Sequence, residues 1–341
     1  MIVFTCGGTG GHITPAIYIA NQLKSDYMFI GGNRIEKQLL KSYNFNEIST
    51  SRKNVFKIVS GIFQAYKLLK KNKVSAVFST GGYVTLPVGI AAVLANIPLI
   101  LLEQNSVPGK TNSFLARFSA LIFTGYPNMD KYFSKKKTLY SGNPIENNRG
   151  KIKKKEKRNK LLITGGSQGA QQINRIILEL LPLLKNIKLE IIWSTGKNNY
   201  KEVLHSLQGY VDEKQKIIYH GIHIHLHPYI DDLSRLLPEV KIAISRAGAM
   251  SIAELIGNEI PAIYIPYPYA THNHQHENAQ FVRDTNAGIL LNESEVQPTI
   301  IFQMINKLQN NYELYLENLN KLKSETAIDI IIKNLSEKGY L

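Results

Sequence analysis

Short apolar runs of strand length alternate with helical patterns along most of the chain. Such alternation predicts parallel sheets that are covered by helices on both faces. The expected strands are residues 2–6, 27–32, 76–80, 98–103 and 121–125 in the first half, and 160–166, 189–196, 216–221, 241–248 and 261–266 in the second.

The uncharged stretch VTLPVGIAAVLANIPLILL, residues 84–102, is long enough to span a membrane. Pro87, Asn96 and Pro98 interrupt it, however. We therefore expect a buried helix over about 85–95, a turn at Asn96 and a buried strand that ends at Leu102.

A strand, a glycine-rich turn and a helix occur twice at corresponding places. The opening MIVFTCGGTGGHITPA is matched by KLLITGGSQGAQQIN from residue 160, and AVFSTGGYVTLPVGIAA by KIAISRAGAMSIAELI. The predicted fold class is therefore α/β, with two doubly wound, Rossmann-like domains that face a cleft. Ligands of such sheets bind beyond the carboxyl ends of the strands.

The boundary between the two halves is expected at a run of basic residues. Seven of the ten residues in 151–160 are lysine or arginine. Such a run indicates an exposed linker, with a phosphate or lipid-headgroup contact as the alternative. The predicted division is an N-terminal domain over 1–145, the linker over 146–160, a C-terminal domain over 161–325 and a last helix over 326–341, which packs back on the first domain in many folds of this kind.

The glycine turns suggest an anionic ligand. Glycine permits positive φ and close backbone approach, and the following helix offers unpaired N–H groups and the positive end of its dipole. Diphosphate suits such a site, and Thr9 and Ser167 add hydroxyl groups. Gly31, Gly32 and Asn33 stand where a dinucleotide oxidoreductase needs an acidic residue, so hydride transfer is disfavoured.

Charge and cysteine content narrow the classes of partner. The formal net charge of +15 predicts attraction to nucleic acid, anionic lipid or a phosphorylated substrate. No nucleic-acid-binding module is recognisable, so nucleic acid is the disfavoured partner. Cys6 is the one cysteine, which excludes an internal disulfide, and its place after an apolar run indicates a small core residue.

Five segments resemble one family over nearly the whole chain: GGTGGHITPA, EQNSVPGKTN, GGSQGAQQIN, SRAGAMSIAEL and NHQHENA. They are similar to the MurG family, the membrane-associated N-acetylglucosaminyltransferases of bacterial peptidoglycan synthesis and cell-wall growth. The resemblance implies a GT-B fold and inverting transfer of GlcNAc from UDP-GlcNAc to the C4 hydroxyl of MurNAc in lipid I (undecaprenyl-diphospho-MurNAc-pentapeptide), which gives lipid II. It also implies no cofactor, no metal and a peripheral place on the cytoplasmic face of the inner membrane.

Two other GT-B activities remain as alternatives, a UDP-GlcNAc epimerase and a glycolipid glycosyltransferase. The segment EQNSVPG argues against the epimerase because it is similar to the lipid-acceptor family specifically. A basic nucleic-acid-binding protein is the alternative from a different class.

The resemblance also implies roles for single residues. It places the donor diphosphate on the amides of Ala249, Met250 and Ser251, with Arg246 just before them and Ser167 near a phosphate. It places the ribose on Glu254, the uracil at Ile230, and the GlcNAc hydroxyls at Gln275 and Asn278. On the other side of the cleft it places Asn105, Thr9, Gly10 and Gly11. The alternatives are a solvent-facing Glu254, a structural ion pair for Arg246, and helix capping by Gln275 and Asn278.

The catalytic base is expected among three residues. His12 follows the first glycine turn and titrates near neutral pH. Glu103 ends an apolar strand, and Tyr83 follows the glycine turn at residues 81–82. We expect His12 and Glu103 to share the acceptor site, one as the base and the other positioning it.

Three places depart from the family pattern. Leu102 replaces a histidine before EQN, and His272 and Asn273 replace acidic residues. Glu146 stands where the family has an arginine near the diphosphate, so another cation is expected there, such as Arg149 or a linker lysine.

Histidines gather in two alternating sets. His223, His225 and His227 would share one face of a strand, and His272, His274 and His276 form the second set. Zinc binding is the less favoured interpretation, and surface histidines without metal the favoured one.

Residues 55–73, VFKIVSGIFQAYKLLKKNK, form an apolar helical stripe flanked by lysines. A basic amphipathic helix binds anionic membrane surfaces, so we expect peripheral membrane binding through this region. The alternative is an ordinary helix that covers the sheet, and both interpretations can hold together. The stripe comprises Val55, Phe56, Val59, Ile62, Phe63, Tyr66 and Leu69, and the flanking lysines are Lys57, Lys67, Lys70, Lys71 and Lys73.

Overall fold

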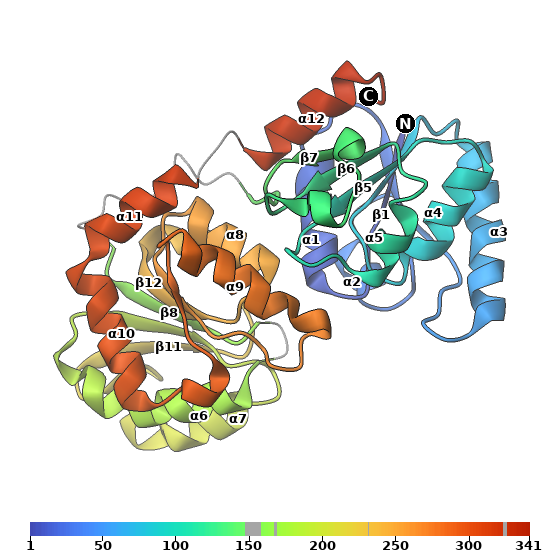
Figure 1. The fold of residues 1–341 in the computed structure, drawn as a ribbon. Coiled ribbons are helices and arrows are strands. Elements are labelled where there is room, and N and C mark those ends of the chain that lie inside the picture. The colour runs from blue at the N-terminus through green and yellow to red at the C-terminus, as the bar shows by residue number, and fades with distance from the viewer. Residues whose placement is uncertain (147–157, 167–168, 231, 323–325) are drawn as a thin grey trace. The chain divides into compact units, whose positions relative to one another are not determined.

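The computed structural model describes residues 1–146, 158–166, 169–230, 232–322 and 326–341. The chain divides into two compact units (Figure 1). The N-terminal unit comprises Met1–Ile145 with Glu325–Leu341, and the C-terminal unit comprises Glu146–Ser324. Each unit is described by itself.

The N-terminal unit contains a parallel sheet in the order β3-β2-β1-β4-β5-β6-β7 within its described residues. β1 pairs with β4 in a register that sets Thr5 beside Ser79, so the turns after these two strands leave the sheet at the same edge. The strands are β1 (Ile2–Thr5), β2 (Tyr27–Gly31), β3 (Phe45–Glu47), β4 (Ala76–Ser79), β5 (Leu99–Glu103), β6 (Leu121–Thr124) and β7 (Thr138–Tyr140).

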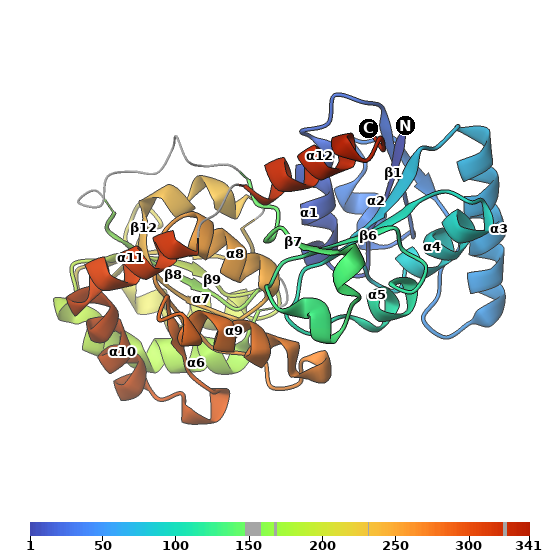
Figure 2. The ribbon, with the colours of Figure 1, turned by 45° about the horizontal axis from the view of Figure 1, so that its top comes forward.

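Helices cover both faces of this sheet, as Figure 2 shows. Ile2 and Phe4 of β1 face the core under α1 and α12, whereas Val3 faces the core under α3, α4 and α5. This alternation along β1 is what a strand buried on both faces requires. The helices are α1 (Gly10–Ala20), α2 (Ile35–Leu39), α3 (Val55–Lys71), α4 (Thr85–Leu94), α5 (Lys110–Leu115) and α12 (Ala327–Glu337).

The last helix, α12, belongs to the N-terminal unit although it follows the C-terminal unit in sequence. Ile331 and Leu335 join the core that includes Ile13 of α1. The carbonyl of Tyr340 accepts a hydrogen bond from Ser75 Oγ at 2.9 Å. The chain therefore ends as part of the domain in which it began.

The C-terminal unit contains a sheet in the order β10-β11-β9-β8-β12-β13-β14 within its described residues. All pairs are parallel except β10 with β11, a hairpin that the expectation of parallel pairing missed. Gly221, with a φ of 87°, forms the tight turn of that hairpin. The strands are β8 (Lys160–Thr164), β9 (Glu190–Ser194), β10 (Ile217–Tyr219), β11 (Ile222–His227), β12 (Val240–Ser245), β13 (Ala262–Tyr264) and β14 (Ile289–Leu290).

One continuous hydrophobic core holds the C-terminal unit together. Trp193 of β9 is its largest buried side chain, and its indole N–H donates to Asn174 Oδ1 at 3.0 Å. The helices are α6 (Gln171–Leu180), α7 (Tyr200–Ser206), α8 (Ala249–Gly257), α9 (His274–Asp284), α10 (Pro298–Asn310) and α11 (Tyr312–Lys321). The predicted α/β class with two doubly wound domains is confirmed.

The interpretation of residues 84–102 is confirmed. α4 ends at Leu94, Asn96 has a φ of 56°, and β5 begins at Leu99. Pro87 lies in the first turn of α4, where its missing N–H costs no intrahelical hydrogen bond. None of the helices in the described residues is both long and apolar enough to cross a bilayer.

The expected exposed linker lies mostly outside the described residues, and at its described end the prediction holds for Asn159 but is wrong for Arg158. Arg158 is buried and donates to the carbonyls of Asn258 and Glu259, at 3.1 and 2.8 Å. Lys160 begins β8 and pairs with Glu239 at 2.7 Å. These two cations find partners far along the chain, which composition alone does not reveal.

Candidate functional site

The first glycine turn of the N-terminal unit encloses a carboxylate. The N–H of Gly8 donates to Glu36 Oε1 at 2.6 Å, and the N–H of Arg34 donates to Glu36 Oε2 at 3.3 Å. A Cβ on Gly7 would overlap Oε1 of Glu36, which explains why this position has no side chain. Sequence reasoning missed Glu36 because it lies in an ordinary helical pattern with no recognisable motif.

Cys6 lies beside this carboxylate and is fully buried. Burial, and then the charge of Glu36, raise the pKa of the Cys6 thiol far above its ordinary value. The interpretation of Cys6 as a core residue rather than a nucleophile is confirmed.

The turn at Gly81–Gly82 packs against the first glycine turn. A Cβ on Gly82 would overlap the carbonyl oxygen of Gly7 and would lie 3.3 Å from Cδ2 of His12. The hydroxyl of Thr80 donates to the backbone carbonyl of His12 at 2.6 Å. The Tyr83 ring lies 3.5 Å from the position that a Gly8 Cβ would occupy. His12 and Tyr83 are therefore brought together beyond β1 and β4.

Glu103 organises the loop after β5. Its Oε1 accepts from the backbone N–H and the side-chain amide of Asn105, at 3.0 and 3.2 Å. Its Oε2 accepts from the N–H of Gly109 and from Asn112 Nδ2, at 3.0 and 2.9 Å. Because both oxygens are engaged, this geometry suits a group that positions Asn105 better than a proton acceptor.

Asn112 connects Glu103 with His12. A Cβ on Gly81 would lie 3.1 Å from Asn112 Nδ2 and 3.4 Å from Cε1 of His12. The imidazole and the amide that binds Glu103 thus both lie close to Gly81. The structure therefore places His12, Tyr83 and Glu103 at one edge of the sheet.

The N-terminus of α1 is open. Thr9 and Gly11 are exposed, and within the described residues the Thr9 side chain makes no capping hydrogen bond. A Cβ on Gly10 would meet no atom within 4 Å. The amides at this helix start can therefore reach a ligand.

The corresponding turn of the C-terminal unit is described only in part. The N–H of Gly166 donates to Thr164 Oγ1 at 3.2 Å, and the N–H of Gly169 to the carbonyl of Gly166 at 3.0 Å. Ser167, the residue expected near a phosphate, lies outside the described residues.

The start of α8 offers backbone amides at the carboxyl edge of the second sheet. α8 begins at Ala249, and Gly248 before it has no side chain with which to cap the helix. The amides of Ala249, Met250 and Ser251 precede the first intrahelical bond, in which Ile252 N donates to Gly248 O at 3.0 Å. Such a start suits an anion.

Asn278 and Gln275 of α9 support the neighbouring loops. Asn278 is fully buried and donates from Nδ2 to the carbonyl of Ala247 at 3.2 Å, which fixes the bend before α8. Gln275 Oε1 accepts from the N–H of Tyr267 at 2.9 Å. Both of these hydrogen bonds join α9 to a loop backbone.

Arg246 forms a structural ion pair, the alternative left open by the sequence. Its Nη1 lies 2.5 Å from Glu293 Oε2 and also donates to the carbonyls of Ile265 and Pro266, at 3.2 and 3.0 Å. Its guanidinium lies 5.5 Å from the centre of the Tyr267 ring. The charge expected near the diphosphate is therefore already balanced by Glu293.

Glu254 lies near two other carboxylates. Burial, and then the charges of Glu146 and Asp232, raise its pKa to about 7. The hydroxyl of Ser234 lies 2.5 Å from Glu146 Oε2 and 2.5 Å from Asp232 Oδ1. Glu254 is half-buried, which fits neither a freely solvent-facing side chain nor a fully enclosed one.

Glu146 contacts Ser234, a neighbour of Asp232. The expected substitute cations, Arg149 and the linker lysines 151–157, lie outside the described residues. Ile230, the expected uracil contact, lies after β11 and packs partly against the core of the unit.

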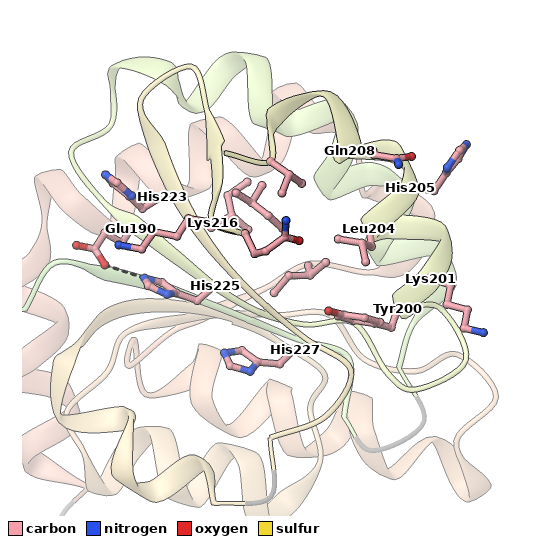
Figure 3. Close-up of a pocket in the computed structure, with 15 residues that line it drawn as sticks. Glu190, Tyr200, Lys201, Leu204, His205, Gln208, Lys216, His223, His225 and His227 are labelled. Atoms are coloured by element: carbon pink, nitrogen blue, oxygen red, sulfur yellow. Dashed lines mark hydrogen bonds and ion pairs between the residues drawn. The ribbon is translucent and has the colours of Figure 1, made fainter. Parts of the chain in front are cut away.

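A separate cavity of about 1060 Å³ lies along β11 and α7 (Figure 3). The set His223, His225 and His227 lines it, as the alternation predicted, and His225 Nε2 lies 2.9 Å from Glu190 Oε2. The hydrogen bond with His225 lowers the pKa of Glu190. None of the residues predicted for the donor or acceptor sites lines this cavity.

The described residues contain no group of three or more His, Cys, Asp or Glu side chains placed to hold a metal ion. The second set of histidines precedes and begins α9, where His272 and Asn273 have φ values of 53° and 55°. The zinc interpretation therefore has no support in this part of the chain.

Comparison with known proteins assigns both units to one glycosyltransferase family. Residues 2–124 match the glycosyltransferase family 28 N-terminal domain, and residues 160–333 match the family 28 C-terminal domain. A relative from Halothermothrix orenii is 36% identical over 91% of this chain and 90% of its own length. A relative from Caldanaerobacter subterraneus is 33% identical over 97% of each chain. Both are named UDP-N-acetylglucosamine--N-acetylmuramyl-(pentapeptide) pyrophosphoryl-undecaprenol N-acetylglucosamine transferase.

Among solved structures, the crystal structure of Acinetobacter baumannii MurG is similar with a TM-score of 0.78. It is 26% identical in sequence, and the match covers 98% of each chain. These similarities agree with the GT-B fold that the sequence predicted.

Proposed function

The chain belongs to glycosyltransferase family 28 and, within it, to the MurG enzymes, and from this premise we propose that it transfers GlcNAc from UDP-GlcNAc to lipid I. The acceptor is the C4 hydroxyl of the MurNAc unit, the product is lipid II for peptidoglycan synthesis, and the anomeric configuration inverts. One observation carries the proposal: the amides of Ala249–Ser251 precede the first intrahelical hydrogen bond of α8, and Glu254 lies one turn later.

The C-terminal unit binds the donor. The amides of Ala249–Ser251 receive the diphosphate, because a helix start stabilises the charge that departing UDP gains. Glu254 accepts hydrogen bonds from the ribose hydroxyls, and the backbone at Ile230 contacts the uracil. Gln275 contacts the GlcNAc hydroxyls, and Asn278 supports this site by fixing the Ala247 carbonyl.

The N-terminal unit binds the acceptor and supplies the base. His12 takes the proton of the C4 hydroxyl, and the oxygen forms a bond to C1 of GlcNAc. The bond between C1 and the diphosphate oxygen breaks, and its electron pair leaves on UDP. Glu103 holds Asn105 in place through its two hydrogen bonds, and Tyr83 lies beside the base.

Helix α3 carries the enzyme to the membrane surface that holds its lipid-linked acceptor. It packs on the unit through the small or buried residues Gly61, Ala65 and Leu69. Phe56 and Phe63 remain 88% and 66% exposed, and Val55 and Val59 are exposed beside them. The stripe predicted from the sequence is thus divided between core and surface.

Lysines surround this exposed apolar surface. Lys57, Lys67 and Lys71 are exposed, and Lys70 donates to the carbonyl of Ala95 at 3.2 Å. Such a surface binds a membrane peripherally. The apolar side chains enter the membrane–water interface, and the lysines contact anionic headgroups. The cytoplasmic face of the inner membrane is the place where UDP-GlcNAc and such a surface meet.

A turnover assay tests the proposed function. The purified chain is mixed with UDP-GlcNAc and a soluble lipid I analogue, and the disaccharide product and UDP are measured together. Equal amounts of both products support the transfer. Release of UDP without disaccharide, or conversion of UDP-GlcNAc into its C2 epimer, would contradict it.

A further inference from the structure

The carboxylate of Glu36 occupies the inside of the first glycine turn. Glu36 is completely buried, and its Oε1 receives the Gly8 N–H at 2.6 Å. Its Oε2 receives the Arg34 N–H at 3.3 Å. A buried carboxylate whose two oxygens both accept backbone N–H groups is held in one position by those bonds.

Three glycines make room for this side chain. A Cβ on Gly7 would overlap Oε1, one on Gly31 would lie 3.4 Å from Cγ of Glu36, and one on Gly32 would lie 3.5 Å from Oε2. The glycines at 7, 31 and 32 therefore surround a side chain of the same chain rather than an empty space.

We propose that Glu36 is the resident anion of the first glycine turn and a positioning residue for the acceptor site. The Gly8 N–H, which a phosphate would use, is already bonded to a carboxylate. A phosphate at this turn would therefore have to use the amides at the start of α1 rather than the Gly8 N–H. This inference rests on the proposed function.

The position of Glu36 affects His12 and Tyr83 through the first glycine turn and the turn at Gly81–Gly82. Glu36 holds Gly8, and the Gly7 carbonyl packs against Gly82 with no room for a Cβ between them. A Cβ on Gly82 would lie 3.3 Å from the His12 ring, and one on Gly8 would lie 3.5 Å from the Tyr83 ring. Loss of the carboxylate would free the segment that presents His12.

Chemical rescue separates this role from simple filling of space. Glu36→Ala is assayed with UDP-GlcNAc and a soluble lipid I analogue as potassium formate replaces potassium chloride at constant ionic strength. We expect kcat to fall by about tenfold or more, because hydrogen bonds to charged groups are lost. The KM for UDP-GlcNAc should stay within about twofold of the wild-type value, since the donor residues lie in the other unit.

Formate is expected to restore part of the kcat of Glu36→Ala and to raise its melting temperature relative to chloride. The wild type should show neither effect, because its turn is filled. Glu36→Gln keeps an acceptor for the Gly8 N–H without the charge, so its kcat should fall several-fold and formate should not restore it. Glu47→Ala removes an exposed carboxylate of the same region, bonded to Lys37 at 3.2 Å, and should behave as wild type.

The inference is overturned if folded Glu36→Ala keeps the wild-type kcat, or if formate and chloride act alike on both its kcat and its melting temperature. If Glu36→Ala does not fold, a wild-type kcat for Glu36→Gln overturns it. A wild type that makes no disaccharide defeats the proposed function instead, and the melting response of Glu36→Ala to formate still tests the resident anion.

Discussion

The guanidinium of Arg246 and the carboxylate of Glu293 form a nearly buried ion pair, with Nη1 and Oε2 2.5 Å apart and the side chains 9% and 14% exposed. Arg246 follows β12 directly, and Glu293 follows β14. The pair therefore ties the bend before α8 to the far edge of the sheet. Arg246 therefore supports the proposed diphosphate site by holding the bend before α8 in place.

Removing one member of this pair should destabilise the protein. Glu293→Gln leaves the buried guanidinium without its counter-charge, so the free energy of unfolding should fall by about 3 kcal/mol. Urea denaturation measures it, with the exposed Glu317→Gln as the control. The double variant Arg246→Met with Glu293→Met should recover much of the loss. A Glu293→Gln protein as stable as wild type would show that the pair is unimportant.

Donor binding should weaken as the pH falls through about 7. The pKa of Glu254 is raised to about 7 by burial and by its acidic neighbours. The ionised carboxylate accepts both ribose hydroxyl hydrogens and the neutral acid does not, so the Kd for UDP-GlcNAc should rise by up to about tenfold per pH unit below that pKa. Calorimetric titration from pH 5.5 to 8.5 tests this. Glu254→Gln should bind more weakly with a flat profile, and an equally sloping profile would assign the titration to another group.

His12 and Glu103 should differ in their effects on the pH profile. His12→Gln should lower kcat by about a hundredfold or more and remove the acidic limb of the kcat profile at saturating UDP-GlcNAc, as expected for loss of a general base. Glu103→Gln should keep that limb but lose about 1–3 kcal/mol of stability, because its amide nitrogen faces N–H donors. The measurement uses saturating lipid I analogue. If both variants keep turnover near the wild-type value, the base is neither residue.

Membrane binding should depend on α3. The double change Phe56→Ser and Phe63→Ser should weaken binding to vesicles that contain anionic lipid by about tenfold or more, since two exposed aromatic rings no longer enter the interface. Flotation measures it. Leu314→Ser, at a residue of α11 that is 55% exposed, is the matched control and should float as wild type does. Binding that is insensitive to anionic lipid would argue against α3 as the contact.

The parts of the fold that local patterns determine were predictable from the sequence. The strand, glycine turn and helix that open each half are local features, and so is the break at Asn96, whose φ is 56°. Short strands at or near the sheet edges, such as β3 and β14, were missed because two or three residues carry no periodic signal.

The candidate site was predictable in its composition but not in its contacts. Sequence motifs pointed to Arg246 and Glu103, yet their partners, Glu293 and Asn112, are set by how the chain folds back. Glu36 carried no sequence signal at all, because a glutamate in a short amphipathic helix is ordinarily exposed. Only the tertiary contact with Gly8 gives it a role.

A structure of the enzyme with UDP-GlcNAc bound tests the central claim most directly, because it reports which groups touch the diphosphate. The account predicts the diphosphate within hydrogen-bond distance of the Ala249–Ser251 amides, and the ribose hydroxyls on Glu254. A UDP-sugar bound away from residues 245–254, or a diphosphate held to the protein by a divalent ion, would contradict it.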